Sequence, residues 1–336
     1  MRERKIQMKD TKYPSILYHY ASMEKAISIL KYKNFRLSDI TKSNDVNEMS
    51  ICFPRLFNEM INSYDGFSYE FTYKEKEGRE GFGILVKELR ERIEREFEDG
   101  TISTFVICLS EEGDLLSQWR GYADDGRGIC LGFNVHELLE FTDTSNITGY
   151  ALEKVQYLSK EELDQWIKNV ANELLQLVNI VLGAIEDRNI VYNSDVEFDK
   201  DIFDTLYYNI IAEIEESIKF KADGFKEEKE WCLFIKNSLN KDEIDKKEYS
   251  SIGRLSEETR RKVSEFVDAN IDFNIKENDI VPFISLGFDK FYNNLISEVI
   301  CGPNNMIRKS DLGMFLRKYG YSNCEHRKSS ITYIVR

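Results

Sequence analysis

The chain has 336 residues, and 60 Asp and Glu against 46 Lys and Arg leave a formal net charge of −14. Its 42% hydrophobic and 12% aromatic residues can bury a large core, which excludes a disordered protein. The acidic balance also excludes a protein that binds nucleic acid mainly through a basic surface.

No segment of the sequence marks a domain boundary. The chain has four prolines, no Gly/Ser-rich stretch and no repeat, so we expect a single elaborated domain over residues 1–336. The longest apolar stretch, Leu174 to Ile185, contains Gln176 and Asn179 and is too short to cross a hydrocarbon core of about 30 Å. The first ten residues hold no apolar segment typical of a secretory signal. The sequence therefore predicts a cytoplasmic protein that does not enter a membrane.

The cysteines and histidines give no sign of a metal site. The six cysteines stand far apart in the sequence without a C-x-x-C pair, and most lie in apolar runs where a free thiol packs like a small hydrophobic group. There are three histidines and no H-E-x-x-H motif. We therefore expect neither a structural disulfide nor a metal cofactor.

The first half of the chain mixes short strands and helices. β-Branched and aromatic runs predict strands at 15–20, 35–38, 102–109, 128–133 and 152–157. A 3.6-residue period or a capping residue predicts helices at 23–31, 83–98, 115–122 and 135–141. A polar loop is expected at 41–47.

The second half begins with a helical block. From 159 to about 222 the period is helical with a polar break near 187–199, which predicts two helices inserted into a sheet protein. Strands follow at 230–235, 279–286, 298–301 and 331–335, and Ser310 is expected to cap a helix at 311–318. Because strands and helices do not alternate regularly, the fold class is α+β.

Polar and aromatic residues gather at the ends of predicted strands, where a scaffold usually presents its site. On the first strand, alternation places His19 on the opposite sheet face from Tyr18 and Tyr20, and a histidine used only for packing is the alternative. The segment from Ser43 to Glu48 fits a turn before a capped helix equally well.

Two later segments combine the same residue types. Ser110 closes a strand, and Trp119 with Tyr122 lies on one helix face, where packing against the core explains the aromatics as well as stacking on a ligand does. Glu228 and Glu230 point the same way from an extended chain. A carboxylate at that rim can stabilise positive charge in a cleft or protect an exposed edge from aggregation.

The order of these blocks resembles an uncharacterised bacterial family, domain of unknown function 2971. The blocks are LYHYAS, NDVNE, CLS followed by QWRGYA and GICLGF, then EKEW and EVICGP. The resemblance runs from Tyr18 to about Pro303, although the helices from 159 to 222 match nothing specific.

The opening LYHYASMEKAISIL and FRLS also resemble the start of the ADP-ribosyltransferase superfamily, especially its DNA-modifying toxin branch. That resemblance implies a split β-sheet core with an inserted helical block at about 159–222, and NAD as the substrate. His19 matches the first-strand residue that contacts NAD, Ser110 falls at the place of a Ser-Thr-Ser strand, and Glu228 with Glu230 matches the Glu-x-Glu motif. Ser110 is, however, followed by two glutamates, and Glu298 fits the carboxylate strand nearly as well as Glu230.

The resemblance implies an enzyme that breaks the nicotinamide–ribose bond of NAD. The ADP-ribose would pass to a protein or nucleic acid, or the cofactor would simply be depleted, as in toxins and anti-phage defence. The implied catalytic residues are Glu230, Glu228 and Glu298, and the implied cofactor-binding residues are His19, Tyr20, Ser110, Trp119 and Tyr122. A carboxylate suits this reaction because the breaking bond develops oxocarbenium character. The alternative is a module without catalysis that senses a nucleotide or a partner protein on the same fold.

Overall fold

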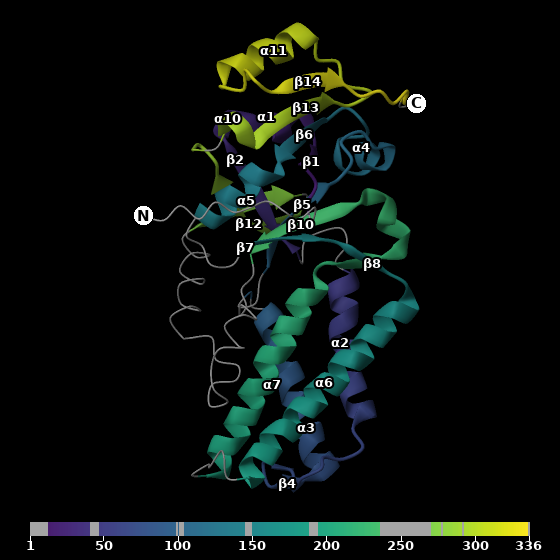
Figure 1. The fold of residues 1–336 in the computed structure, drawn as a ribbon, viewed down its shortest axis with the longest axis vertical. Helices are drawn as coiled ribbons and strands as arrows, with labels where there is room; N and C mark the ends of the chain where they lie inside the picture. The colour runs from purple at the N-terminus through teal and green to yellow at the C-terminus, as the bar shows by residue number, and fades with distance from the viewer. Residues whose placement is uncertain are drawn as a thin grey trace.

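A computed structural model describes residues 13–40, 47–98, 100, 104–144, 150–187, 194–235, 270–276, 278–290 and 292–334. Figure 1 shows that the fold has a sheet-rich part and a bundle of long helices that extends away from it. The fold is α+β, as the sequence predicted, and its main sheet is mixed. No helix among the described residues is both long enough and apolar enough to cross a bilayer.

Within the described residues, the main sheet has ten strands in the order β11-β12-β2-β5-β1-β6-β13-β14, with β10 paired to β5 and β7 to β10. All of its pairings are antiparallel except that of β13 with β14. The strands are β1 (Ile16–Ala21), β2 (Asn34–Asp39), β5 (Phe105–Ser110), β6 (Ile129–Asn134), β7 (Tyr150–Lys154), β10 (Glu230–Ile235), β11 (Ile271–Lys276), β12 (Asp279–Gly287), β13 (Ile296–Cys301) and β14 (Glu325–Lys328).

The sheet forks at β5. Strand β10 pairs with β5 from Val106 to Ser110 along one edge. On the other edge β2 pairs with Phe105 and Val106, whereas β1 pairs with Ser110. Strands β1 and β2 therefore diverge from a shared edge, and the sheet is split at this point.

One face of the sheet carries the main hydrophobic core. Leu17, Leu131 and Val299 point to this face and are fully buried, as are Ala26 and Leu30 of helix α1 (Met23–Tyr32). Ser22 caps α1 by accepting a hydrogen bond from the Lys25 backbone N–H. Helices α5 (Val135–Thr144), α10 (Tyr292–Leu295) and α11 (Lys309–Lys318) contribute to the same core.

The opposite face is covered by the short helix α4 (Leu116–Tyr122). Its Trp119 packs with Tyr20, Cys130 and Ile300, which are the residues that alternate with the main core along β1, β6 and β13. This face therefore has a small aromatic core of its own next to the candidate site.

A second large core lies in the helical bundle. It joins Phe57 of α2 (Asn47–Ser63), Leu89 of α3 (Gly78–Glu98), Leu174 of α6 (Lys160–Glu186) and Leu206 of α7 (Asp195–Ser217). The bundle is therefore built from two separate chain segments, of which the sequence predicted the second at 159–222. The remaining pieces are a hairpin of β3 (Thr72–Tyr73) and β4 (Lys76–Glu77), a parallel pair of β8 (Gln156–Leu158) and β9 (Phe220–Ala222), and the 3-10 helix η2 (Asp223–Glu228).

Most predicted elements are present, and the errors have physical reasons. The C-terminal strand predicted at 331–335 is wrong for its described residues 331–334, which are irregular; the charged segment β14 pairs with β13 instead. The prediction that Ser310 caps α11 is wrong, because the helix begins at Lys309 and Ser310 already lies in its first turn; the N-cap is Arg308. Residues 41–46, 102 and 103 lie outside the described residues, so the loop at 41–47 and the segment Ser43–Glu48 are described only from Asn47, which begins α2.

Candidate functional site

Five residues form a straight row across the sheet on the face covered by α4. Glu230 pairs with Ser110, Ser110 with Tyr18, Tyr18 with Gly132, and Gly132 with Glu298. Residues directly opposite in antiparallel strands point to the same face. The sequence-predicted Ser110, Glu230 and Glu298 therefore share one face, with Glu230 and Glu298 at the two ends of the row.

The Glu230 end of the row holds a buried charge cluster. Lys221 of β9 forms ion pairs with Glu230 Oε2 and, at 3.5 Å, with Glu228 Oε2. The three residues are only 6–8% exposed. Two carboxylates and one ammonium group leave a net negative charge in a site with little solvent to screen it.

The backbone explains why both glutamates reach the same lysine. Lys229, between them, has a φ of +45°, so the chain turns sharply as η2 ends and β10 begins. The extended chain that the sequence predicted for Glu228 to Glu230 is therefore wrong, because Glu228 ends a 3-10 helix. Ser110 fixes this turn, because its hydroxyl donates to the Glu228 carbonyl oxygen at 2.7 Å and accepts from the Glu112 backbone N–H at 3.1 Å. The Ser110 side chain therefore holds the backbone that carries the two glutamates.

Two tyrosines border the cluster. Tyr122 at the end of α4 is 40% exposed and donates to Glu228 Oε1 at 3.4 Å. Tyr157 of β8 accepts a hydrogen bond from the Glu230 backbone N–H at 2.8 Å, and burial raises its pKa to about 12. Tyr122 therefore presents a ring surface beside the carboxylates, whereas Tyr157 holds the start of β10.

His19 stands at the fork of the sheet. Its Nδ1 lies 3.1 Å from the Cys108 carbonyl oxygen, in the stretch of β5 between the residues paired with β2 and with β1. By alternation its side chain leaves β1 on the face opposite to Tyr18 and Tyr20, as the sequence predicted. Burial lowers the pKa of His19, so its imidazole is neutral near pH 7. The structure therefore brings His19 to the fork but not to the face that carries the glutamates.

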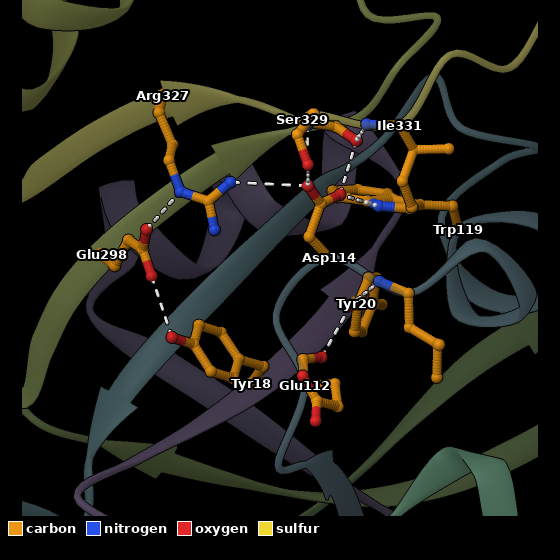
Figure 2. Close-up of polar contacts among 11 residues, drawn as sticks. Tyr18, Tyr20, Glu112, Asp114, Trp119, Glu298, Arg327, Ser329 and Ile331 are labelled. Carbon is orange, nitrogen blue, oxygen red and sulfur yellow. Dashed lines mark hydrogen bonds and ion pairs between the residues drawn. The ribbon is translucent and has the colours of Figure 1, made fainter.

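At the other end of the row Glu298 belongs to a hydrogen-bonded network, drawn in Figure 2. Tyr18 donates to Glu298 Oε2 at 3.0 Å, and Arg327 Nε lies 2.7 Å from Oε1. Burial and then the bond to Glu298 raise the pKa of Tyr18 to about 12. Arg327 also pairs with Asp114 at 3.5 Å. Both oxygens of Glu298 are thus engaged in links between β13, β14 and β1.

Tyr20 and Trp119 are used for packing in the structure. Trp119 is fully buried, its ring meets Tyr20 edge-on at 4.9 Å, and its indole N–H donates to Asp114 at 2.8 Å. Tyr20 is 5% exposed, donates to the Glu112 carbonyl oxygen and accepts from the Leu115 backbone N–H. The resemblance implied that Tyr20 and Trp119 bind the cofactor. Their burial argues against this role, because neither ring has an exposed face on which nicotinamide could stack.

Two thiols lie beside the glutamate cluster. Cys232 of β10 pairs directly with Cys108 of β5, and their Sγ atoms are 3.9 Å apart. Both sulfurs and a carboxylate oxygen of Glu230 lie within 4.8 Å of one another. The hydrogen bond to Cys232 raises the pKa of the Cys108 thiol. The cysteines stand far apart in the sequence, which predicted no metal cluster, but the pairing of β10 with β5 brings Cys108 and Cys232 together.

One comparison with known proteins gives a match. A family model described as "Protein of unknown function (DUF2971)" matches residues 118–233. This part of the chain is similar to that family. The matched segment runs from α4 to β10 and includes Lys221, Glu228 and Glu230, but it does not reach His19 or Glu298. No curated protein and no solved structure matches the chain.

Sequence reasoning missed Lys221, Tyr157 and the thiol pair. Lys221 and Tyr157 lie on the short strands β9 and β8, which flank the two long helices and have no distinctive pattern. A groove of about 290 Å³ between α6 and α7, lined by Leu174 and Ile180 among others, contains none of the predicted site residues. The cluster of Lys221, Glu228 and Glu230 is therefore the candidate site that the geometry supports best.

Proposed function

We propose that this protein is an NAD-cleaving enzyme of the ADP-ribosyltransferase type. The observation that carries the proposal is the buried Glu228–Lys221–Glu230 cluster, held by Ser110 on the strand where the sheet forks. A negative cluster removed from water can stabilise a cationic transition state more strongly than a solvated carboxylate can.

In the proposed reaction the bond between ribose C1′ and the nicotinamide nitrogen breaks, and its electron pair leaves with nicotinamide. The ribose acquires oxocarbenium character, which the Glu230 carboxylate stabilises. An oxygen or nitrogen of the acceptor then forms a bond to C1′ and loses its proton to a nearby base, a role that we assign to Glu228. With water as the acceptor, the products are nicotinamide, ADP-ribose and a proton.

Further residues around the cluster have roles in the proposal. Tyr122 has an exposed ring next to Glu228, so it is the aromatic side chain that we assign to stacking on nicotinamide. Ser110 positions the glutamates, whereas His19 leaves β1 on the opposite face of the sheet and has no role on this face. Lys221 offsets part of the electrostatic repulsion between the two glutamates.

The proposal includes a macromolecular acceptor, either protein or nucleic acid, and a role as a toxin or anti-phage defence effector. The overall acidity of the chain favours an acceptor recognised through specific loops rather than through a basic surface.

The test follows free nicotinamide after NAD is mixed with the purified chain, alone and with cell lysate as a source of acceptors. We expect release, and we expect the Glu230→Gln variant to lose it. Absence of release from the folded wild-type protein under both conditions would refute the proposal.

A second candidate function is a nucleotide or partner sensor without catalysis. It is favoured by the ion pair between Glu230 and Lys221, which occupies the carboxylate in the absence of ligand. Thermal unfolding with NAD separates the two, since ligand at a hundred times its Kd stabilises the fold by about 2.7 kcal/mol. Stabilisation by NAD without nicotinamide release identifies the sensor.

A further inference from the structure

The cysteine pair beside Glu230 has a geometry that suits a metal ion. A tetrahedral zinc ion binds thiolates at about 2.3 Å, which places two sulfurs about 3.8 Å apart. The Cys108 and Cys232 sulfurs are 3.9 Å apart. A disulfide needs a sulfur–sulfur distance of about 2.05 Å, so the two sulfurs would have to move closer together to form one, whereas zinc binding needs almost no movement.

We propose that Cys108, Cys232 and Glu230 bind a thiophilic divalent cation such as Zn²⁺. Glu230 and Cys232 are two residues apart on β10, so their side chains share one face, and Cys108 of the paired strand β5 lies next to them. Three ligands from two adjacent strands therefore point at one position. A carboxylate has two oxygens, so Glu230 can bind the ion through one and keep Lys221 on the other. The fourth tetrahedral position is left for water.

Charge and access also fit a cation at this position. Each thiol releases its proton to solvent when its sulfur binds the ion, so Zn²⁺ replaces two protons and the charge of the cluster does not change. Cys232 is buried but Cys108 is exposed, which gives the ion a route from the surface to its ligands.

The metal site has a consequence for NAD cleavage, and this step rests on the proposed function. The ion and the oxocarbenium-like ribose both require the carboxylate of Glu230. Bound Zn²⁺ therefore occupies the carboxylate that the reaction uses, and the cation acts as an inhibitor at the site itself.

The first experiment measures metal binding alone. The reduced full chain is titrated with Co²⁺, and the thiolate-to-cobalt absorption in the near ultraviolet is followed. We expect a band that saturates at one ion per chain, and its displacement by Zn²⁺. The Cys108→Ala and Cys232→Ala variants should each lose the two-thiolate band, and Glu230→Gln should weaken binding by at least about tenfold.

The matched control is Cys301→Ala, since Cys301 is also buried but belongs to the core on the opposite sheet face. It should bind Co²⁺ like the wild type. Circular dichroism of each variant checks that it is folded. If the Cys232→Ala variant unfolds, the test rests on Cys108→Ala, because Cys108 is exposed and its substitution should not disturb the core. No thiolate band in the wild type, or an unchanged band in Cys108→Ala, overturns the proposal.

The second experiment compares nicotinamide release with and without Zn²⁺ in each variant. A lower rate with Zn²⁺ in the wild type, and a smaller effect in Cys108→Ala, supports inhibition at this site. A Co²⁺ band in a protein that releases no nicotinamide under any condition refutes the proposed function and leaves the metal site standing.

Discussion

Glu230 and Glu298 lie on the same sheet face in one register row, separated by the three residues Ser110, Tyr18 and Gly132 on intervening strands. Four strand spacings correspond to about 19 Å. Pairs of carboxylates that act on one glycosidic bond are at most about 9.5 Å apart. The two glutamates therefore cannot act together on one ribose, and their surroundings separate their roles. Glu230 shares a lysine with a second carboxylate, whereas Glu298 joins three strands.

The first prediction compares these glutamates. Glu230→Gln should lower the rate of nicotinamide release by at least about a hundredfold, because it removes the charge aimed at the developing cation. Glu298→Gln is the matched control and should retain most of the rate, but it should lose about 1 kcal/mol of unfolding free energy because its ion pair with Arg327 is lost. A rate lost in Glu298→Gln and kept in Glu230→Gln would reverse the assignment.

The second prediction concerns Lys221. In Lys221→Met two carboxylates remain buried next to each other without a cation, so the free energy of unfolding at pH 7 should fall by about 3–5 kcal/mol. Urea unfolding measures the change. Lys226→Met is the control, since Lys226 lies nearby on η2 with an exposed side chain and pairs with an exposed carboxylate, Asp223. Equal effects of the two substitutions would contradict a structural role for the buried cluster.

The third prediction concerns the packing of the Tyr18 ring against Gly113. A Cβ added at Gly113 would lie 2.4 Å from Tyr18 Cε1, so Gly113→Ala should displace the ring and cost about 1–3 kcal/mol of unfolding free energy. Gly121→Ala is the control: it lies in α4 with open space around its Cβ position, and should be neutral or stabilise by about 0.5–1 kcal/mol. The comparison fails if Gly113→Ala is as stable as wild type.

The fourth prediction is a pH dependence that originates at Asp114. Burial alone would raise the pKa of Asp114, but hydrogen bonds from Ser329, Ser330 and Trp119 outweigh it and hold the pKa below the usual 3.8. A carboxyl with a lowered folded pKa stabilises the fold above its unfolded pKa, and this stability is lost as the pH falls through the folded value.

The Asp114→Asn variant should therefore be less stable than the wild type at pH 6. The difference in unfolding free energy should shrink as the pH falls below about 4. Urea unfolding across this range measures both proteins. A difference that stays constant with pH would show that the Asp114 charge is not what stabilises the network.

Local patterns were sufficient for most elements of the fold. The runs that form β1, β5, β6 and β10 are short, apolar and β-branched or aromatic, and their propensities agree with their buried positions. Strand β14, with the sequence Glu-His-Arg-Lys, has no such signal because it is an edge strand held by its pairing with β13. Its formation depends on a neighbour that no local pattern reveals.

The sequence predicted the glutamates of the site but not the residues that pair with them. The motif around Glu228 and Glu230 was visible because both lie within one short segment. Lys221 was not, since its approach to the glutamates depends on the turn at Lys229 and on the small β8–β9 pair. Cys108 and Cys232 meet through strand register across 124 positions of sequence, which alternation alone does not determine.

The composition of the helical bundle has a consequence for how the chain is made. Helices α2 and α3 leave the ribosome before β5, and the helices that complete their core, α6 and α7, follow only after β8. Until residues 160–217 have been synthesised, the apolar sides of α2 and α3 have no partner from the later segment. Completion of the bundle is therefore a late event in synthesis, and a nascent chain stalled before α6 exposes half of a hydrophobic core to chaperones and proteases.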